Sequence, residues 1–201
     1  MGIGLLFIAL QCAAAANRTI LVFGDSLSAA HGLRLQQGWV ALLARRLRRQ
    51  AYRYRIVNAS VSGETTAGGV VRLPHELKAC RPGIVILELG ANDGLRGLPL
   101  TLAERHLAAM IRMSKTSGAR VLLVGMLIPP NYGPRYTKQF AAMYPQLARR
   151  YHLRLVPFLL KQVALDPQLM QSDDLHPNAR GEPLVLDTLW PYLKPMLTRG
   201  R

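Results

Sequence analysis

The chain has 201 residues, of which half are hydrophobic and 18% are charged, a composition typical of a globular domain and not of a disordered chain. Its 26 Lys and Arg residues against 11 Asp and Glu residues give a formal net charge of +15 at pH 7. Such a surface attracts anions without specificity. The sequence contains no zinc-ligand spacing, RNP-like aromatic block or heptad run, so we expect no nucleic-acid partner.

The first sixteen residues resemble a secretory signal peptide. Ile3 to Leu10 is apolar and Ala14-Ala15-Ala16 fits the small-x-small cleavage rule, although Met1-Gly2 supplies no basic residue. The stretch is too short to span a bilayer. We therefore expect a periplasmic or secreted protein in which residues 17–201 form one domain, with an uncleaved anchor or a buried N-terminal helix as alternatives. Cleavage would leave Cys80 without an internal disulfide partner, and we expect a monomer.

Five short runs rich in Val, Ile and Leu predict β-strands, at residues 19–23, 55–59, 84–89, 120–124 and 153–158. The first, third and fourth are nearly continuous in apolar residues, which is typical of strands buried on both faces of a parallel sheet. The segments between them have helical spacing. The alternation predicts an α/β protein, a three-layer α/β/α sandwich around a five-stranded parallel sheet with right-handed crossovers.

The helical segments carry further expectations. Trp39, Leu43 and Leu47 recur at i, i+4 and i+8 and predict a buried helix face. Thr101, with Glu104 three residues on, predicts an N-cap, and another helix is expected from about 136 to 151. The last helix is expected to begin after Pro177 and to reach about residue 197, with a break near Pro191.

A cluster of arginines lies on and after the first predicted helix, at Arg45, Arg46, Arg48, Arg49, Arg53 and Arg55. The simplest interpretation is a solvated helix face. The alternative is a weak attraction to anionic lipid surfaces.

The candidate nucleophile is Ser26, in Gly24-Asp25-Ser26-Leu27-Ser28 directly after the first predicted strand. Ligands of α/β folds collect at the carboxyl ends of such strands. The Gly-x-Ser-x-Gly elbow of α/β-hydrolases is absent from the sequence, so the base and the oxyanion donors must come from elsewhere.

Loops at the same sheet edge supply candidates for these roles. Gly63, after the second strand, and Asn92, after the third, offer a backbone N–H and a side-chain amide of the kind that stabilise an oxyanion. Among the five histidines, His176 alone has an acid three residues earlier, Asp173, which can accept from Nδ1–H while Nε2 faces the serine. We assign capping of the last helix to Asp174.

These residues, in this order, resemble the four sequence blocks of SGNH/GDSL hydrolases. Residues 57–63, 87–97 and 130–133 resemble, more narrowly, the bacterial periplasmic acyl-CoA thioesterase, lysophospholipase and arylesterase branch. The resemblance implies a flavodoxin-like sandwich, no cofactor and no metal. It also implies the roles: Ser26 as nucleophile and oxyanion donor, Gly63 and Asn92 as further donors, His176 as base and then acid, and Asp173 as its orienter.

The resemblance implies a small acyl ester or thioester as the substrate, such as a fatty acyl-CoA, a lysophospholipid or an aryl ester. We expect the acyl chain to contact Leu95, Leu98, Leu127, Ile128 and Pro129, although ordinary loop packing explains any one of them equally well. Three alternatives stay open: a carbohydrate O-deacetylase on the same fold, a non-catalytic lipid- or polysaccharide-binding protein, and a Mg²⁺-dependent phosphate site built from Asp25, Asp93, Asp173 and Asp174.

Overall fold

The computed structural model describes residues 18–199, and the expected signal peptide at residues 1–16 lies outside them. Five strands form one parallel sheet in the order β2-β1-β3-β4-β5. Their bounds are Thr19–Gly24 (β1), Arg55–Asn58 (β2), Ile84–Glu88 (β3), Arg120–Val124 (β4) and Arg154–Val156 (β5). The five-stranded α/β architecture predicted from the apolar runs is confirmed, and β5 is shorter than expected at both ends.

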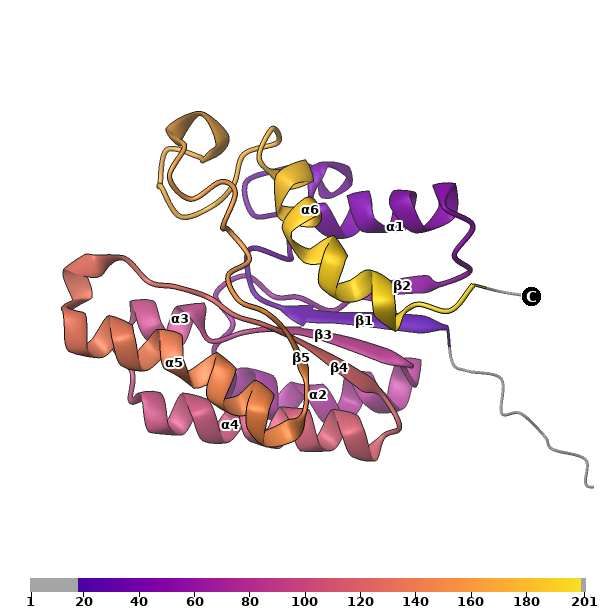
Figure 1. Ribbon diagram of the computed structural model, residues 1–201, viewed down its shortest axis with the longest axis horizontal. Coiled ribbons are helices and arrows are strands. Elements are labelled where there is room, and N and C mark those ends of the chain that lie inside the picture. Colours follow the sequence, from indigo (N-terminus) through magenta and orange to yellow (C-terminus); the bar gives the residue numbers. More distant parts are fainter. Residues whose placement is uncertain (1–17, 200–201) are drawn as a thin grey trace, which may run out of the picture.

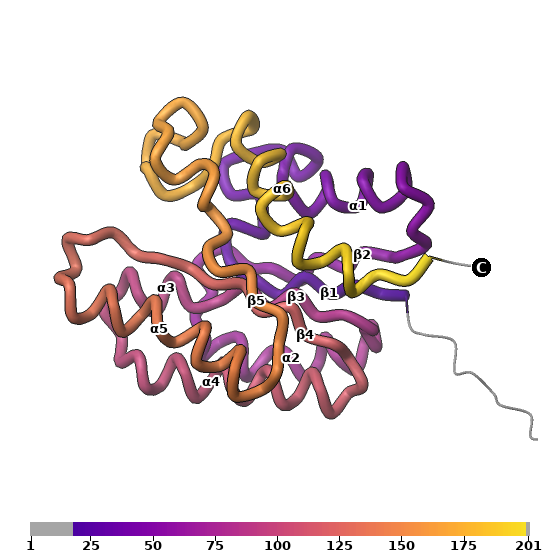
Figure 2. The backbone as a smooth tube through the Cα atoms, viewed as in Figure 1, coloured from indigo at the N-terminus to yellow at the C-terminus, as the bar shows by residue number. Residues whose placement is uncertain are grey.

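Helices cover both faces of the sheet (Figure 1). One face carries α1 (Trp39–Arg49) and α6 (Glu182–Leu193), and the other carries α2 (Thr66–Cys80), α4 (Leu100–Thr116) and α5 (Pro134–Tyr151). The short helix α3 (Ala91–Leu95) follows β3 directly. The tube in Figure 2 shows that the loops after the strands gather at the end of the sheet opposite the start of β1.

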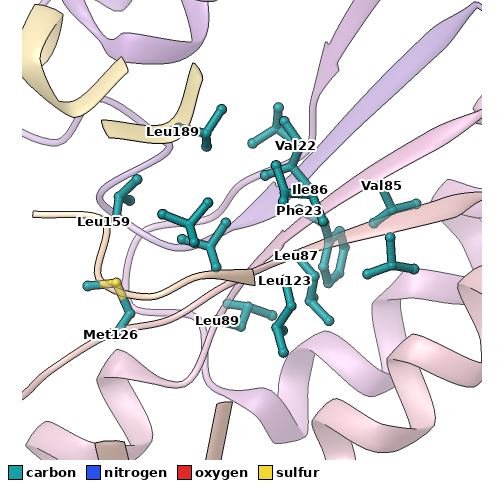
Figure 3. Packing of buried hydrophobic residues seen from close by; sticks show 14 of the residues in the cluster. Val22, Phe23, Val85, Ile86, Leu87, Leu89, Leu123, Met126, Leu159 and Leu189 are labelled. Atoms are coloured by element: carbon teal, nitrogen blue, oxygen red, sulfur yellow. The ribbon is translucent and has the colours of Figure 1, made fainter. Parts of the chain in front are cut away.

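The core is aliphatic and is centred on β1 and β3. Every residue of both strands is buried, because each strand has helices on both faces. Figure 3 shows Val22 and Phe23 of β1 beside Ile86 and Leu87 of β3, with Leu189 of α6 approaching from one face. The expected helix positions Trp39, Leu43 and Leu47 are all fully buried in this core. A rigid, dry centre of this kind fixes where the strand ends lie.

Two expectations about helix starts are wrong. Thr101 does not cap α4, because the helix already begins at Leu100. The carbonyl of Pro99 accepts from the backbone N–H groups of Leu102 and Ala103. Pro177 does not open the last helix. Asn178 Oδ1 accepts from the N–H groups of Arg180 and Gly181 and holds a turn there, so α6 begins at Glu182.

The expected break near Pro191 does not occur. Helix α6 continues to Leu193 and then tightens into a 3₁₀ turn, Lys194–Met196. Leu189 and Leu193, on either side of the proline, are fully buried. Packing of these side chains against the sheet outweighs the hydrogen bond that proline removes.

A buried carboxyl joins the starts of two helices on one face of the sheet. Glu182 is 2% exposed, and its Oε2 accepts from the backbone N–H of Trp39, the first residue of α1, at 2.6 Å. The contact satisfies one of the unpaired N–H groups at the start of α1. Burial raises the pKa of Glu182 from its ordinary 4.5 to about 7, although the Trp39 N–H acts in the opposite direction.

This carboxyl makes stability depend on pH. An acid whose pKa is higher in the folded state binds more protons there, so its contribution is greatest below pH 4.5 and is lost as the pH rises towards 7. In Glu182→Gln the group no longer ionises. We expect the free energy of unfolding of the variant to rise relative to wild type by about 2 kcal/mol between pH 5 and pH 8. Urea denaturation at the two pH values measures this. The same difference in free energy of unfolding between variant and wild type at pH 5 and at pH 8 would contradict it.

Candidate active site

Ser26 lies at the end of β1, in a turn that its own neighbours hold together. The N–H of Ala29 donates to the carbonyl of Asp25 at 3.0 Å, and the N–H of Leu27 donates to Asp25 Oδ1 at 3.1 Å. Asp25 and Leu27 are buried, whereas Ser26 is half-buried. The turn therefore anchors its flanking residues and leaves the Ser26 hydroxyl accessible.

Asp173, His176 and Ser26 form one hydrogen-bonded chain. His176 Nε2 is 2.8 Å from Ser26 Oγ, and His176 Nδ1 is 2.6 Å from Asp173 Oδ2. A carboxylate only accepts, so Nδ1 carries the ring proton and Nε2 is left to accept from the serine hydroxyl. The residues come from loops 150 positions apart in sequence. The structure thus brings together the three residues predicted from spacing and block order.

Asp173 also holds the turn that carries the histidine. Its Oδ1 accepts from the backbone N–H groups of Leu175 and His176, both at 3.0 Å. Partial burial raises the pKa of this carboxyl. The hydrogen bonds from the His176 ring and from the two N–H groups outweigh that effect and lower the pKa to about 2. Asp173 is therefore ionised at neutral pH.

Asp174 does not cap the last helix as expected. It occupies the left-handed region, with φ of 55°, in the turn just before His176. Asx residues adopt this conformation more readily than most. The helix that it was expected to cap begins eight residues later, at Glu182.

The expected oxyanion donors lie on either side of the serine turn. The loop after β2 is tied to the end of β1 by a hydrogen bond from the Val61 N–H to the Gly24 carbonyl, at 3.1 Å. Gly63, in that loop, has φ of 79°, a backbone conformation that glycine adopts without strain. Asn92 Nδ2 donates to Asp25 Oδ2 at 3.2 Å. This bond orients the amide, and the second Nδ2 hydrogen stays available to a substrate oxygen.

Two buried carboxyls, those of Asp25 and Glu88, lie next to the Ser26 turn. Glu88, at the end of β3, accepts through Oε2 from Ser28 Oγ at 2.7 Å and from the Asp25 N–H at 3.3 Å. Burial raises the pKa of Asp25 to about 6 and, with the nearby Asp25 charge, raises the pKa of Glu88 well above its usual range. A neutral Glu88 adds no negative charge below a developing oxyanion. Gly24 makes the packing feasible, since a Cβ there would lie 2.5 Å from Glu88 Oε2.

His31 contacts His176, which the sequence did not indicate. The two imidazole rings have centroids 4.5 Å apart and are tilted by 39°. Gln171 joins their loops: its N–H donates to the His176 carbonyl at 2.7 Å, and its Nε2 donates to the His31 carbonyl at 2.8 Å. No local spacing signals this contact, because it depends on where a long loop returns to the site.

An apolar cavity of about 620 Å³ opens beside Ser26. Its walls come from the loops after β1, β3, β4 and β5 and from residues 170–176. Of the five residues expected to meet an acyl chain, four line it: Leu95, Leu127, Ile128 and Pro129. Leu98 is not among the lining residues, and its carbonyl accepts from the Tyr136 hydroxyl at 3.0 Å. Met126, Phe158 and Leu160 complete the apolar wall.

Three of the four aspartates considered for a Mg²⁺ site accept hydrogen bonds from protein donors. Asp93 accepts from the N–H and hydroxyl of Thr66, at 2.8 and 2.6 Å, while Asp25 and Asp173 make the bonds described above. Within residues 18–199, no group of three or more His, Cys, Asp or Glu side chains is arranged to hold a metal ion.

A parallel α/β sheet with a serine, a histidine and a carboxylate hydrogen-bonded in series at its carboxyl edge defines a serine hydrolase. Comparison with known proteins agrees and is more specific. Residues 22–183 match the GDSL-like lipase/acylhydrolase family, and the chain belongs to that family.

Three relatives illustrate the range of activities found in this family. Esterase TesA of Pseudomonas aeruginosa is 47% identical over 96% of both chains. Thioesterase 1/protease 1/lysophospholipase L1 of Escherichia coli K12 is 39% identical over 96% of this chain and 91% of its own. The crystal structure of the psychrotrophic esterase EstA of Pseudoalteromonas, inhibited by monoethylphosphonate, superposes with a TM-score of 0.86 at 40% identity, over 89% and 98% of the two chains. The chain is an esterase or thioesterase of the same kind.

Proposed function

We propose that this enzyme hydrolyses fatty acyl esters and thioesters through an acyl-enzyme on Ser26, with His176 as base and acid and Asp173 as the residue that orients it. The single observation that carries the proposal is the continuous hydrogen-bonded chain from Asp173 Oδ2 through His176 to Ser26 Oγ, beside an apolar cavity. Ester and thioester hydrolysis by this chemistry needs no metal or organic cofactor.

The reaction proceeds in two halves. His176 Nε2 takes the hydroxyl proton as Ser26 Oγ attacks the acyl carbon, and the carbonyl oxygen becomes an oxyanion held by the Ser26 N–H, the Gly63 N–H and the Asn92 amide. The imidazolium then protonates the leaving alcohol or thiol as the C–O or C–S bond breaks. Water, deprotonated by the same imidazole, attacks the acyl-enzyme, and collapse of the second tetrahedral intermediate releases the fatty acid and returns the proton to Ser26.

The cavity favours a medium or long aliphatic acyl group. Its lining is dominated by Leu, Ile, Met, Phe and Pro side chains, and burying each CH₂ of an acyl chain there contributes about 0.8 kcal/mol. An acetyl group gains little from such a volume, so the cavity argues against a carbohydrate O-deacetylase. A binding protein without catalysis would have no use for the hydrogen bond between His176 and Ser26.

A substrate panel tests the proposal. Purified enzyme is assayed on p-nitrophenyl esters and acyl-CoAs of two to sixteen carbons, on lysophospholipids and on acetylated sugars. We expect kcat/KM to rise with chain length within each ester series and to be lowest on acetylated sugars. A preference for acetylated sugars would favour the deacetylase, and binding without turnover would favour the lipid-binding protein.

The Asn92 amide is expected to act on the transition state. Asn92→Ala removes one oxyanion donor and leaves the Asp25 carboxyl without its amide partner. We expect kcat to fall by about 10²–10³ with a much smaller change in KM, as for loss of one such donor elsewhere. Steady-state kinetics on an ester that reaches saturation separates the two constants. A change confined to KM would show that Asn92 only binds substrate.

We also propose that the enzyme works as a monomer. We propose in addition that it works outside the cytoplasm, because residues 1–16 resemble a signal peptide. No helix in the part of the chain that the structure describes is long and apolar enough to cross a membrane. N-terminal sequencing of protein from cell fractions and light scattering test the two statements. Binding to anionic vesicles, compared with neutral ones, tests the arginine-rich face.

A further inference from the structure

The acyl cavity leaves one direction open for the leaving group. In the tetrahedral intermediate the acyl carbon bears Ser26 Oγ, the oxyanion, the acyl chain and the leaving atom. The acyl chain occupies a cavity whose walls follow β1, β3, β4 and β5. No residue of the β2 loop lines that cavity, although the loop is hydrogen-bonded to the end of β1. The acyl chain therefore does not take up the side of Ser26 that faces this loop, and the leaving group can extend there.

Arg96 lies on that side. It is exposed, it follows α3 directly, and its Nη2 donates to the carbonyl of Gly63 in the β2 loop at 3.1 Å. A Cβ built on Gly63 would find this Nη2 as its only neighbour within 4 Å, at 3.6 Å. The guanidinium thus covers the residue expected to donate to the oxyanion.

The charge of Arg96 is not neutralised within residues 18–199. The ion pairs there involve Arg46, Arg72, Arg150 and His176, and the bond to Gly63 uses one of the five N–H donors of the guanidinium. Arg72, the other arginine at the β2 loop, is paired with Glu64 and Glu76. Arg96 is therefore an exposed cation at this loop without a carboxylate partner among residues 18–199, whereas Arg72 is ion-paired.

Hydrogen bonds from two tyrosines hold the loop that carries Arg96. The hydroxyl of Tyr132 donates to the Leu95 carbonyl at 2.7 Å, and that of Tyr136 donates to the Leu98 carbonyl at 3.0 Å. The N–H of Leu98 also donates to the Asp93 carbonyl at 2.9 Å. These bonds hold the backbone on both sides of Arg96, so its position does not depend on the contact with Gly63 alone.

We infer that Arg96 is a binding site for a phosphate group on the leaving group, and so selects phosphorylated substrates over neutral esters with the same acyl chain. This inference rests on the proposed function and names its substrate class. The planar guanidinium pairs with phosphate oxygens through parallel N–H···O bonds. Two leaving groups share this chemistry: the phosphorylated thiol of an acyl-CoA and the glycerophosphoryl group of a lysophospholipid.

Matched substrate pairs isolate the phosphate. Decanoyl-CoA is compared with the decanoyl thioester of N-acetylcysteamine, and decanoyl lysophosphatidic acid with monodecanoylglycerol. The selectivity is the ratio of kcat/KM within each pair. In Arg96→Gln we expect at least one ratio to fall by about tenfold, mostly through KM, the size of effect typical of a hydrogen bond to a charged group. Arg96→Lys keeps the charge without the fork and should give an intermediate ratio.

A distant arginine supplies the matched control. Arg112, on α4, donates to the Tyr151 hydroxyl at the end of α5, and Arg112→Gln removes the same charge without changing either ratio. A fall confined to the thioester pair identifies the coenzyme as the source of the phosphate, and a fall confined to the glycerol pair identifies the lipid headgroup. Equal losses on both members of each pair would show that Arg96 only holds Gly63 and would overturn the inference. A wild-type enzyme inactive on all four substrates would overturn the proposed function as well.

Discussion

Replacing Ser26 with alanine is expected to lower kcat by a factor of about 10⁴ or more, as removal of the nucleophile does in other serine hydrolases. The alanine variant lacks the oxygen that must bond to the acyl carbon, while the cavity and the oxyanion donors remain. Substrate binding should therefore persist and turnover should not. Hydrolysis of a p-nitrophenyl decanoate measures the loss, and KM or a fluorescent acyl probe measures binding.

A phosphonate ester makes the test independent of turnover. One related esterase is inhibited by monoethylphosphonate. We expect an alkyl phosphonate ester to transfer its phosphonyl group to the wild-type chain, with loss of its alcohol leaving group and of the serine proton, and not to Ser26→Ala. Ser117→Ala is the matched control, because the Ser117 hydroxyl only donates to the carbonyl of Ser114 at the far end of α4. It should be labelled and active like wild type. A labelled Ser26→Ala variant would place the nucleophile at another residue.

The sheet was predictable because burial leaves a direct trace in sequence. β1 and β3 are central, fully buried strands, and their nearly continuous apolar runs reflect that. Strand β5 is an edge strand of three residues, so its apolar run extended beyond the hydrogen-bonded part. Helix ends were less predictable, since the start of α6 is decided by the Asn178 turn and by tertiary packing.

The histidine and its acid were predictable because they are three residues apart on one turn, while the serine follows a strand end. Parallel topology then brings all three to the same edge of the sheet. The surroundings were not predictable in the same way. The contact of the His31 ring with His176, the bridge through Gln171 and the hydrogen bonds of the buried Glu88 each join segments 60 or more positions apart. No local pattern records which residue meets which across that separation, and the position of Leu98 outside the cavity has the same cause.

The replacement of Asp173 by asparagine is expected to lower kcat by about 10³–10⁴, because an amide in this position favours the wrong histidine tautomer. Asn offers an N–H to Nδ1, and the ring then carries its proton on Nε2, where it cannot accept from Ser26. The backbone bonds from Leu175 and His176 can still go to the amide oxygen, so the turn should survive. Since the pKa of Asp173 is about 2, the deficit should persist at every pH from about 5 to 9, where the wild-type carboxylate is ionised.

Two other aspartates, one distant and one adjacent, make this test specific. Asp187, on α6, forms an exposed ion pair with Arg46 of α1. Asp187→Asn makes the same change in charge away from the site and should leave kcat unaltered. Asp174→Asn alters the adjacent carboxyl, which makes none of the hydrogen bonds to the histidine ring. Its effect should be at least about tenfold smaller than that of Asp173→Asn, because it leaves the tautomer of His176 unchanged. If the larger loss followed the Asp174 substitution, the orienting role would belong to Asp174, and the 2.6 Å contact between Asp173 and His176 would serve only to hold the turn.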